Sequence, residues 1–318
     1  SSDLFHVAEG GRDVLEAERS LGGGGGRASV LVEPVLAVSE MTSLPVITLV
    51  TPSFNQAEFL ERTIQSVVAQ EYPALDWIIV DAMSTDGTKE ILDRYRELPF
   101  LRIIREPDHG QTDAINKGLR VGRGEIAGWL NSDDELLPGA LRAIGEAFAR
   151  NERAVLVYGG GRKIDTRGSL LKKVVAKPFD RRLLRTAFYI LQPSMFFRRE
   201  LAVKLGGLDE SLHYVMDWEL ALRLAEAGEV VRIDAELSAL RCYPGTKTEA
   251  GGWKRFAEIA AVGRKFNGPF DRNFLVYHAR RIAAPFPWAR RVVDFVGWKL
   301  FADRSLMVVG WPAEARES

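Results

Sequence analysis

The sequence predicts an α/β fold in which a mostly parallel central sheet is flanked by helices, with a helical extension at the C-terminal end. From Pro45 onward, short apolar runs alternate with segments of helical periodicity at intervals of about 30 residues, the pattern of consecutive βαβ units. Each apolar run is followed by a polar or acidic segment. Because ligands bind outside the carboxyl ends of strands in open α/β sheets, we expect these segments to meet at one site.

Four strand-and-helix pairs account for the first part of this region. Strands are expected at 46–50, 77–80, 101–104 and 126–130, with helices around 59–68, 91–95, 113–121 and from Pro138 onward. The first strand is a β-branched apolar run that suits burial on both faces, and the turn residues of 51–55 end it. The apolar side chains that follow it recur at helical spacing. A further helix is expected to open at Met216.

Composition narrows the function classes. The 318-residue chain carries 43 Lys and Arg against 43 Asp and Glu, and this balance argues against a protein that binds polyanions over its whole surface. Its single cysteine, Cys242, excludes an intrachain disulfide and a thiolate metal cluster, and favours a reducing compartment. No apolar run approaches the ~20 residues of a membrane span, so we expect a soluble or peripheral protein.

The chain divides into three regions. Residues 1–44 differ in composition from the rest and contain five consecutive glycines, 22–26, which predict a flexible tether. Residues 45–250 hold the alternating pattern and form the expected catalytic domain. Residues 251–318 form a basic, aromatic-rich extension that is expected to be helical.

Asp133 and Asp134 follow the fourth expected strand, so their carboxylates should stand at the carboxyl edge of the sheet. Carboxylate oxygens are hard ligands for Mg²⁺ or Mn²⁺, and a site with one or two of them completes its shell with water and phosphate oxygens. The alternative is that both residues cap the helix expected from Pro138.

Three other acids have a structural and a functional interpretation. Asp81 closes the second strand, where a turn residue is common. Asp113 stands where a helix begins and suits an N-cap. Asp217 lies in the first turn of the helix opening at Met216, where the helix dipole favours an acid, or where it acts as a general base. No Walker-type loop or GxGxxG fingerprint follows any strand, and His109 and His213 are too isolated to suggest a zinc site.

Taken together and in order, these segments are more specific than any of them alone. They resemble the family 2 glycosyltransferases of GT-A fold, over roughly residues 45–248. The residues that carry the resemblance are 51–56 (TPSFNQ), 80–88 (VDAMSTDGT), 106–118 (EPDHGQTDAINKG), 128–134 (GWLNSDD), 192–194 (QPS) and 216–219 (MDWE).

The resemblance implies a hexosyl- or N-acetylhexosaminyl-transferase that moves a sugar from a nucleotide-diphospho-sugar, with a UDP-sugar as the expected donor. The acceptor is a hydroxyl of a glycan or lipid-linked saccharide. It also implies an Mn²⁺ or Mg²⁺ ion, inversion at the anomeric carbon and a role in polysaccharide biosynthesis.

The resemblance also assigns residues, by their match to the family's motifs. Asp133 would ligate the metal with support from Asp134, and Asp217 would be the catalytic base. The residues that would bind the nucleotide-sugar are Thr51, Pro52, Phe54, Asn55, Asp81, Gln111, Asp113, Lys117, Trp129, Asn131, Ser132, Asp134, Gln192 and Lys247.

The chain departs from the family's pattern at three positions. Asn131 stands where the first Asp of the DxD motif is usual, and Ala82 where many members have a second Asp. Tyr243 stands where relatives often have a His that could ligate the metal or contact the diphosphate. Arg241 and Lys247 remain as candidates for binding the diphosphate. These departures leave open a non-catalytic sugar-nucleotide-binding or scaffold protein, and a nucleotidyltransferase is a third alternative.

The C-terminal extension suggests a location. Residues 253–304 hold eleven basic and four acidic residues, a net charge of +7, interleaved with Phe and Trp. This composition fits an interfacial helix on an anionic bilayer, which would place the protein in the cytoplasm or at the inner face of the cell membrane. The alternative is that the aromatic residues pack against the catalytic domain. No RNA- or DNA-binding motif accompanies the extension.

Overall fold

A computed structural model describes residues 44–244, 246, 247 and 252–268, with isolated positions at 279, 283, 286, 288, 289 and 292. These residues belong to one compact unit that begins at Thr42. The predicted glycine tether and most of the C-terminal extension lie outside the described residues. No helix within the described part of the chain combines the length and the apolar character needed to cross a bilayer.

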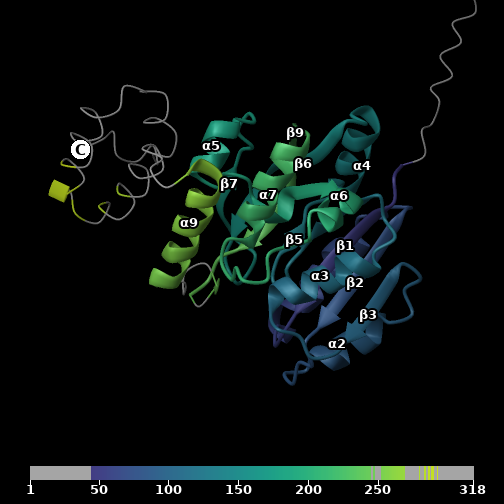
Figure 1. The fold of residues 1–318 in the computed structure, drawn as a ribbon. Coiled ribbons are helices and arrows are strands. Elements are labelled where there is room, and N and C mark those ends of the chain that lie inside the picture. The colour runs from purple at the N-terminus through teal and green to yellow at the C-terminus, as the bar shows by residue number, and fades with distance from the viewer. Residues whose placement is uncertain are drawn as a thin grey trace, which may run out of the picture. The chain divides into compact units, whose positions relative to one another are not determined.

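The four predicted strand-and-helix pairs are confirmed, and they form the parallel half of the sheet (Figure 1). The strands are β1 (Ile47–Ser53), β2 (Leu75–Asp81), β3 (Leu101–Arg105) and β4 (Ile126–Trp129). The helices between and after them are α1 (Ala57–Val68), α2 (Thr88–Tyr95), α3 (Gln111–Val121) and α4 (Ala140–Arg150).

The first strand is longer than predicted. It continues to Ser53 rather than ending at Val50, because Pro52 and Ser53 stay in parallel register with Val80 and Asp81 of β2. The whole strand is buried, so the turn that residues 51–55 predict begins only after Ser53.

The second half of the chain adds five strands: β5 (Glu135–Leu136), β6 (Ala154–Ile164), β7 (Leu170–Val174), β8 (Met195–Arg198) and β9 (Glu229–Arg241). The sheet runs in the order β3-β2-β1-β4-β8-β6-β9-β5, with β7 paired to β6. Strand β8 is antiparallel to both β4 and β6, and β9 is parallel to β6. The remaining helices are α5 (Arg181–Thr186), α6 (Arg199–Lys204), α7 (Met216–Ala227) and α9 (Gly252–Asn267), with a 3₁₀ turn at Gln192–Ser194.

The core lies on both faces of the sheet. Along β1 and β2, Val50 and Ile78 pack with residues of α3 and α7, whereas Leu49 and Ile79 pack with residues of α1 and α4. Alternate residues of a strand point to opposite faces, so both sets are needed to cover the sheet. This arrangement explains why the strand sequences are continuously apolar.

Helix α9 packs on this core. It lies beside α5 in Figure 1, and its Val262 is 2% exposed. Lys265 Nζ lies 2.7 Å from the carboxylate of Glu219 on α7, and the Glu258 carboxylate accepts hydrogen bonds from the backbone N–H groups of His213 and Tyr214. Helix α9, residues 252–267 of the extension, therefore packs against the rest of the protein, and Phe266 is among the side chains in contact with the core. Most residues from 269 onward lie outside the described residues.

Candidate active site

A cavity of about 950 Å³ opens at the carboxyl ends of the parallel strands. Its lining comes from segments far apart in the sequence: the residues after β1, β2 and β4, the start of α3, the 187–192 segment, the start of α7, the end of β9 and one face of α9. The volume lies in the range of small-molecule sites, which suits a nucleotide-sized ligand.

Asp133 and Asp134 line this cavity in different ways. Asp134 is 2% exposed, and its carboxylate accepts hydrogen bonds from the backbone N–H of Arg241 and from the side chain of Asn131. Asp133 is only half-buried, and its Oδ2 accepts a hydrogen bond from the Tyr243 hydroxyl at 2.9 Å. Helix α4 begins at Ala140 after Gly139, so the interpretation of the pair as helix caps is wrong.

The two carboxyl groups have raised pKa values. Burial raises the pKa of Asp133, and burial together with the charge of Asp133 raises the pKa of Asp134 well above its usual value. Two crowded carboxyls in a poorly solvated place favour a bound cation, because it stabilises both charges.

A divalent cation therefore fits this place through Asp133. Within the described part of the chain, no group of three or more His, Cys, Asp or Glu side chains gathers in one place. A cation at Asp133 would have to complete its shell with water and ligand phosphate oxygens, which is usual for Mg²⁺. Asp134 is bonded to the protein on both oxygens, so its direct ligation stays a prediction.

Asn131 is the centre of a hydrogen-bonded chain across the cavity floor. Its Oδ1 accepts from Gln111, and its Nδ2 donates to Asp134 at 3.1 Å and to Gln192 Oε1 at 3.3 Å. Gln111 in turn accepts from Lys247 Nζ at 2.9 Å. An amide can donate and accept at once, which an aspartate in this position could not do.

Asp217 stands at the start of α7 and faces the same cavity. Its Oδ1 accepts from the backbone N–H of Trp218 at 2.8 Å, and the Trp218 indole donates to the Leu184 carbonyl. Burial raises the pKa of Asp217 to about 6, although that hydrogen bond and the charges of Arg255 and Lys247 lower it. A carboxylate with this pKa is a suitable proton acceptor near neutral pH.

Basic groups share this side of the cavity. Lys247 lines it, and burial lowers the pKa of Lys247 to about 8, against the opposing effect of the Asp217 charge. Burial also lowers the pKa of His213, with Lys247 adding to the effect. Lys163 and Arg255 line the cavity as well.

Arg241 has a structural role that the sequence does not predict. Its side chain is buried and donates to the backbone carbonyls of Asp133, Asp165 and Thr166, and it pairs with Glu135. The guanidinium therefore fixes the Asp133–Glu135 loop to β9. Arg241 also lines the cavity, so its contact with a diphosphate stays a prediction.

The predicted residues separate into two groups. Those that line the cavity are Pro52, Phe54, Gln111, Asn131, Ser132, Asp133, Asp134, Gln192, Asp217 and Lys247. Those outside the lining are Thr51, Asn55, Asp81, Asp113, Lys117 and Trp129.

The residues of the second group are bonded or packed within the protein, next to the segments that line the cavity. Asp81 is fully buried and pairs with Arg105 at 2.6 Å. The backbone N–H of Asn55 donates to the Ser84 hydroxyl, and the Asn55 side-chain oxygen accepts from the backbone N–H of Thr85.

The other four residues are also bonded or packed within the protein. Asp113 is paired with Lys117 and accepts from the backbone N–H of His109. Thr51 and Trp129 are core residues. Direct contact of these residues with a ligand stays a prediction.

Ser53 is a lining residue that the sequence did not single out. Its hydroxyl is buried and has no hydrogen-bond partner among the described residues, beside Phe54, which is 60% exposed. An unpartnered buried hydroxyl favours a ligand group at this end of the cavity. Its place at the carboxyl end of β1, within the 51–56 segment, is the signal that could have identified it. His213, Lys163 and Arg255 had no such signal, because long-range folding brings them in.

Comparison with known proteins places these residues in context. Residues 48–206 match the family described as "Glycosyl transferase family 2". The chain is 28% identical over 193 residues to a hyaluronan synthase of Pasteurella multocida, covering 60% of this chain and 20% of that protein. It is 29% identical over 192 residues to a chondroitin synthase of Escherichia coli, covering 60% of this chain and 28% of that protein.

A relative of more similar length is an uncharacterized glycosyltransferase of Mycobacterium tuberculosis, 31% identical over 196 residues, which covers 61% of this chain and 74% of that protein. The match thus spans 20% and 28% of the two synthases and 74% of this shorter relative.

Solved structures show that the fold is GT-A. TarS 1–349 of S. aureus, in complex with UDP-GlcNAc, has a TM-score of 0.61 at 15% identity, over 75% of this chain and 73% of that chain. The mannosyltransferase PcManGT of Pyrobaculum calidifontis, in complex with GDP-Man and Mn²⁺, has a TM-score of 0.57 at 24% identity, over 80% of this chain and 74% of that chain.

Proposed function

The chain belongs to glycosyl transferase family 2, and we propose that it transfers a sugar from a nucleotide-diphospho-sugar, with a UDP-sugar as donor, to a hydroxyl of a glycan or lipid-linked saccharide. The observation that carries this proposal is that Asp133 and Asp217, which belong to separate parts of the chain, line one cavity. Asp133 supplies a ligand for a cation, and Asp217 supplies a base.

Asp217 would act on the acceptor hydroxyl. Its carboxylate takes the proton as the hydroxyl oxygen forms a bond to the anomeric carbon, and the bond from that carbon to the diphosphate oxygen breaks. The nucleoside diphosphate leaves with the electron pair. A single displacement of this kind inverts the anomeric centre and needs one base, without a second carboxylate as nucleophile. General-base catalysis of this type contributes about 10²- to 10⁴-fold.

The diphosphate would lie between Asp133 and Lys247. A bound Mn²⁺ or Mg²⁺ would neutralise charge that develops on the phosphate oxygens. Lys247 is held by its hydrogen bond to Gln111, and its cation adds to this stabilisation. The base of the nucleotide would lie against the exposed ring of Phe54 with Ser53 beside it, since both line the end of the cavity after β1.

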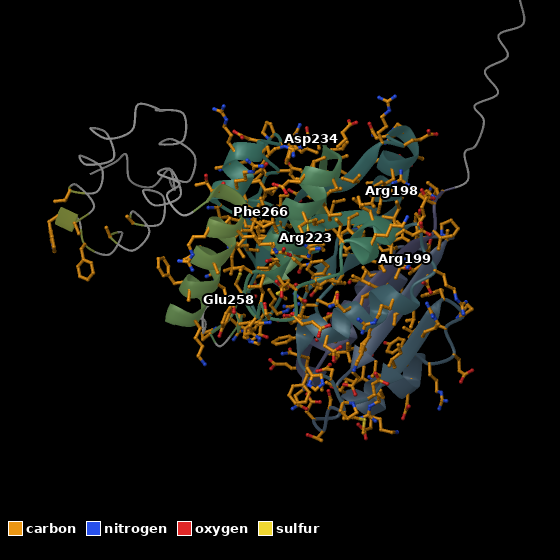
Figure 2. The ribbon with its side chains drawn as sticks, viewed as in Figure 1. Arg198, Arg199, Arg223, Asp234, Glu258 and Phe266 are labelled. Atoms are coloured by element: carbon orange, nitrogen blue, oxygen red, sulfur yellow. The ribbon has the colours of Figure 1, made fainter. Side chains whose placement is uncertain are left out.

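Two substitutions test this assignment. Asp217→Asn keeps the shape of the side chain but removes the base, and Asp133→Ala removes the cation ligand. Each should lower Mn²⁺-dependent release of nucleoside diphosphate by at least about 10²-fold. Asp234→Asn is the matched control, because the side chain of Asp234 on β9 is 88% exposed and is labelled on the upper part of the ribbon in Figure 2. Full activity of both site variants would contradict the proposal.

The same measurements separate the alternatives. A non-catalytic binding protein, which Asn131, Ala82 and Tyr243 suggest, would be stabilised by the nucleotide-sugar without releasing nucleoside diphosphate. A nucleotidyltransferase would release pyrophosphate instead. The expected result is stabilisation together with nucleoside diphosphate release.

The proposed location is the cytoplasm, with peripheral association at the inner face of the membrane through residues 253–304. In support, Phe286 and Trp288 are 55% and 71% exposed. Against a purely membrane-facing extension, two of its basic residues contact the rest of the protein: Lys265 pairs with Glu219, and Arg255 lines the cavity. Deletion of residues 269–318, followed by vesicle co-sedimentation, tests this contribution.

A further inference from the structure

The hairpin of β6 and β7 carries an unusual arrangement of charge. In its antiparallel register, Arg162 stands opposite Lys173 and Lys163 stands opposite Lys172. Like charges directly opposite one another destabilise an antiparallel pair. Two consecutive pairs of this kind indicate that something outside the hairpin compensates the positive charge.

One of these pairs is compensated within the protein. Glu236 of β9 lies 2.7 Å from Arg162 and 3.8 Å from Lys173. The other pair is not, because no acidic side chain of the described residues lies within 4.0 Å of Lys163 or Lys172. Residues 161–177 contain six basic residues and one acidic residue, so the hairpin and its flanks carry a net charge of +5.

The same hairpin exposes large apolar side chains. Leu170 and Leu171 of β7 are 53% and 57% exposed, and Val175 just after it is 76% exposed. Neither face of β7 is covered, because its first four residues are all exposed. In the sheet of the described residues, β7 is paired with β6 alone, so its other edge is unpaired there. Adjacent apolar and basic side chains are typical of surfaces that enter the headgroup region of an anionic bilayer.

We propose that the β6–β7 hairpin docks this protein on an anionic lipid bilayer through the edge of β7. Side chains of both faces flank this edge, Leu170 and Lys172 on one face and Leu171 and Val175 on the other. The apolar side chains enter the headgroup region, and Lys163 and Lys172 contact lipid phosphates. Charge complementarity selects the bilayer as the occupant, because a strand-pairing partner would satisfy backbone groups and leave the lysine pair without counter-charge. The residues of this surface, 163–175, belong to a different part of the sequence from the C-terminal extension.

Docking at this hairpin has a consequence for the cavity. Lys163 belongs both to the unpaired lysine pair and to the cavity lining. A bilayer at the hairpin would therefore lie next to the cavity, where a saccharide on a lipid carrier can enter. Delivery of such an acceptor rests on the proposed function, whereas docking itself does not.

Vesicle co-sedimentation of the full chain tests docking. The wild-type protein should sediment with phosphatidylcholine vesicles that contain phosphatidylglycerol, and far less with phosphatidylcholine alone. Leu171→Ser/Lys172→Glu should weaken binding by about tenfold or more, because it removes an apolar contact and reverses one charge. Val203→Ser/Lys204→Glu on α6 is the matched control, since both of these residues are also exposed and adjacent. It should bind like wild type.

Several results would overturn the proposal. These are the absence of wild-type binding to the anionic vesicles, wild-type binding by the hairpin variant, or an equal loss in the α6 control. A hairpin variant that changes the oligomeric state while vesicle binding stays the same would assign the surface to protein pairing instead. If the double variant does not fold, Val175→Ser tests the same surface without a charge change. It should also weaken vesicle binding.

Donor turnover separates this proposal from the proposed function. Leu171 and Lys172 do not line the cavity. The hairpin variant should therefore release nucleoside diphosphate at the wild-type rate in the absence of vesicles. Vesicle binding by a wild-type protein that releases none would leave docking intact and contradict the proposed function.

Discussion

Two parts of the cavity wall differ in how their polar groups are used. In the frame loops, residues 53–56 and 81–88, most polar side chains are bonded within the protein. Asp81 pairs with Arg105, the Thr85 backbone N–H donates to Asn55, and Asp86 accepts from the backbone N–H of Ala57. The reactive wall, residues 213–218, 243, 246 and 247, contains the groups whose pKa values burial shifts toward neutrality, Asp217 and Lys247.

This difference indicates a division of work. Bonded polar groups make the frame loops rigid, so that they hold the ligand in one orientation. The groups of the reactive wall retain protons that can move at physiological pH. Substitutions in the frame loops should therefore change stability, and those in the reactive wall should change rate and its pH dependence.

The largest effect is expected at Asp217. Asp217→Asn should abolish turnover and at the same time stabilise the fold at about pH 8. The pKa of Asp217 is raised from 3.8 to about 6, so the folded protein carries an unfavourable buried charge above about pH 6. Below about pH 3.8 the carboxyl is protonated in both the folded and the unfolded protein, and the destabilisation is absent. The gain should reach about 3 kcal/mol at most and vanish at low pH. Denaturant unfolding at both pH values, with Asp234→Asn as control, measures it; equal stability at about pH 8 would contradict the shift.

The second effect belongs to the frame loops. Arg105→Met leaves the fully buried Asp81 without its cation, and the side chain of Arg105 is itself 25% exposed. Because an unpaired buried carboxylate is unfavourable, the free energy of unfolding should fall by about 2–4 kcal/mol. Arg96→Met, at an exposed pair on the surface, should change it by less than about 1 kcal/mol. A loss of activity without loss of stability in Arg105→Met would contradict a purely structural role for the pair.

The third effect is on the pH profile of the reactive wall. Turnover should increase with pH along an acidic limb with its midpoint near pH 6, where Asp217 loses its proton. It should decrease along an alkaline limb above about pH 8, where Lys247 loses its charge. Lys247→Met should lower activity and remove the alkaline limb while the acidic limb remains. Initial rates across this range, at constant ionic strength, decide the matter; an unchanged alkaline limb would assign it to another group.

The smallest effect is expected at Asn131, which is linked to Lys247 of the reactive wall through Gln111. In Asn131→Asp, an oxygen replaces the Nδ2 group that donates to Asp134 at 3.1 Å. The added repulsion should lower stability by about 1–2 kcal/mol without metal. Mn²⁺ should restore more stability to this variant than to the wild type, as thermal unfolding with and without the ion would show. Equal Mn²⁺ effects would place the cation away from Asp133.

The sequence predicts the first half of this molecule better than the second. The units through α4 follow from the alternation of apolar runs and helical periods, because each strand and helix forms from local residues. Strands β6 to β9 escape this reasoning, since their register depends on partners far along the chain, such as Gly161 of β6 with Ser238 of β9.

The site is predictable to a similar degree. Position after a strand identified Asp133 as a cavity residue, but it could not distinguish Asp133, which faces the cavity, from Asp81, which turns inward to Arg105. The same uncertainty made Arg241 a candidate for phosphate, although its guanidinium is used by backbone carbonyls. The orientation of a charged side chain depends on its partners in the folded chain, which no local pattern contains.

The pairing of β6 with β9 also bears on how the protein is made. Strand β9 pairs with both β6 and β5, and the backbone N–H of its last residue, Arg241, donates to Asp134. A chain still on the ribosome can form the local units through α4 before β9 has been synthesised. Until Arg241 emerges, however, the loop that holds Asp133 lacks its anchor. We therefore expect nascent chains to acquire donor binding only after Arg241 has left the exit tunnel.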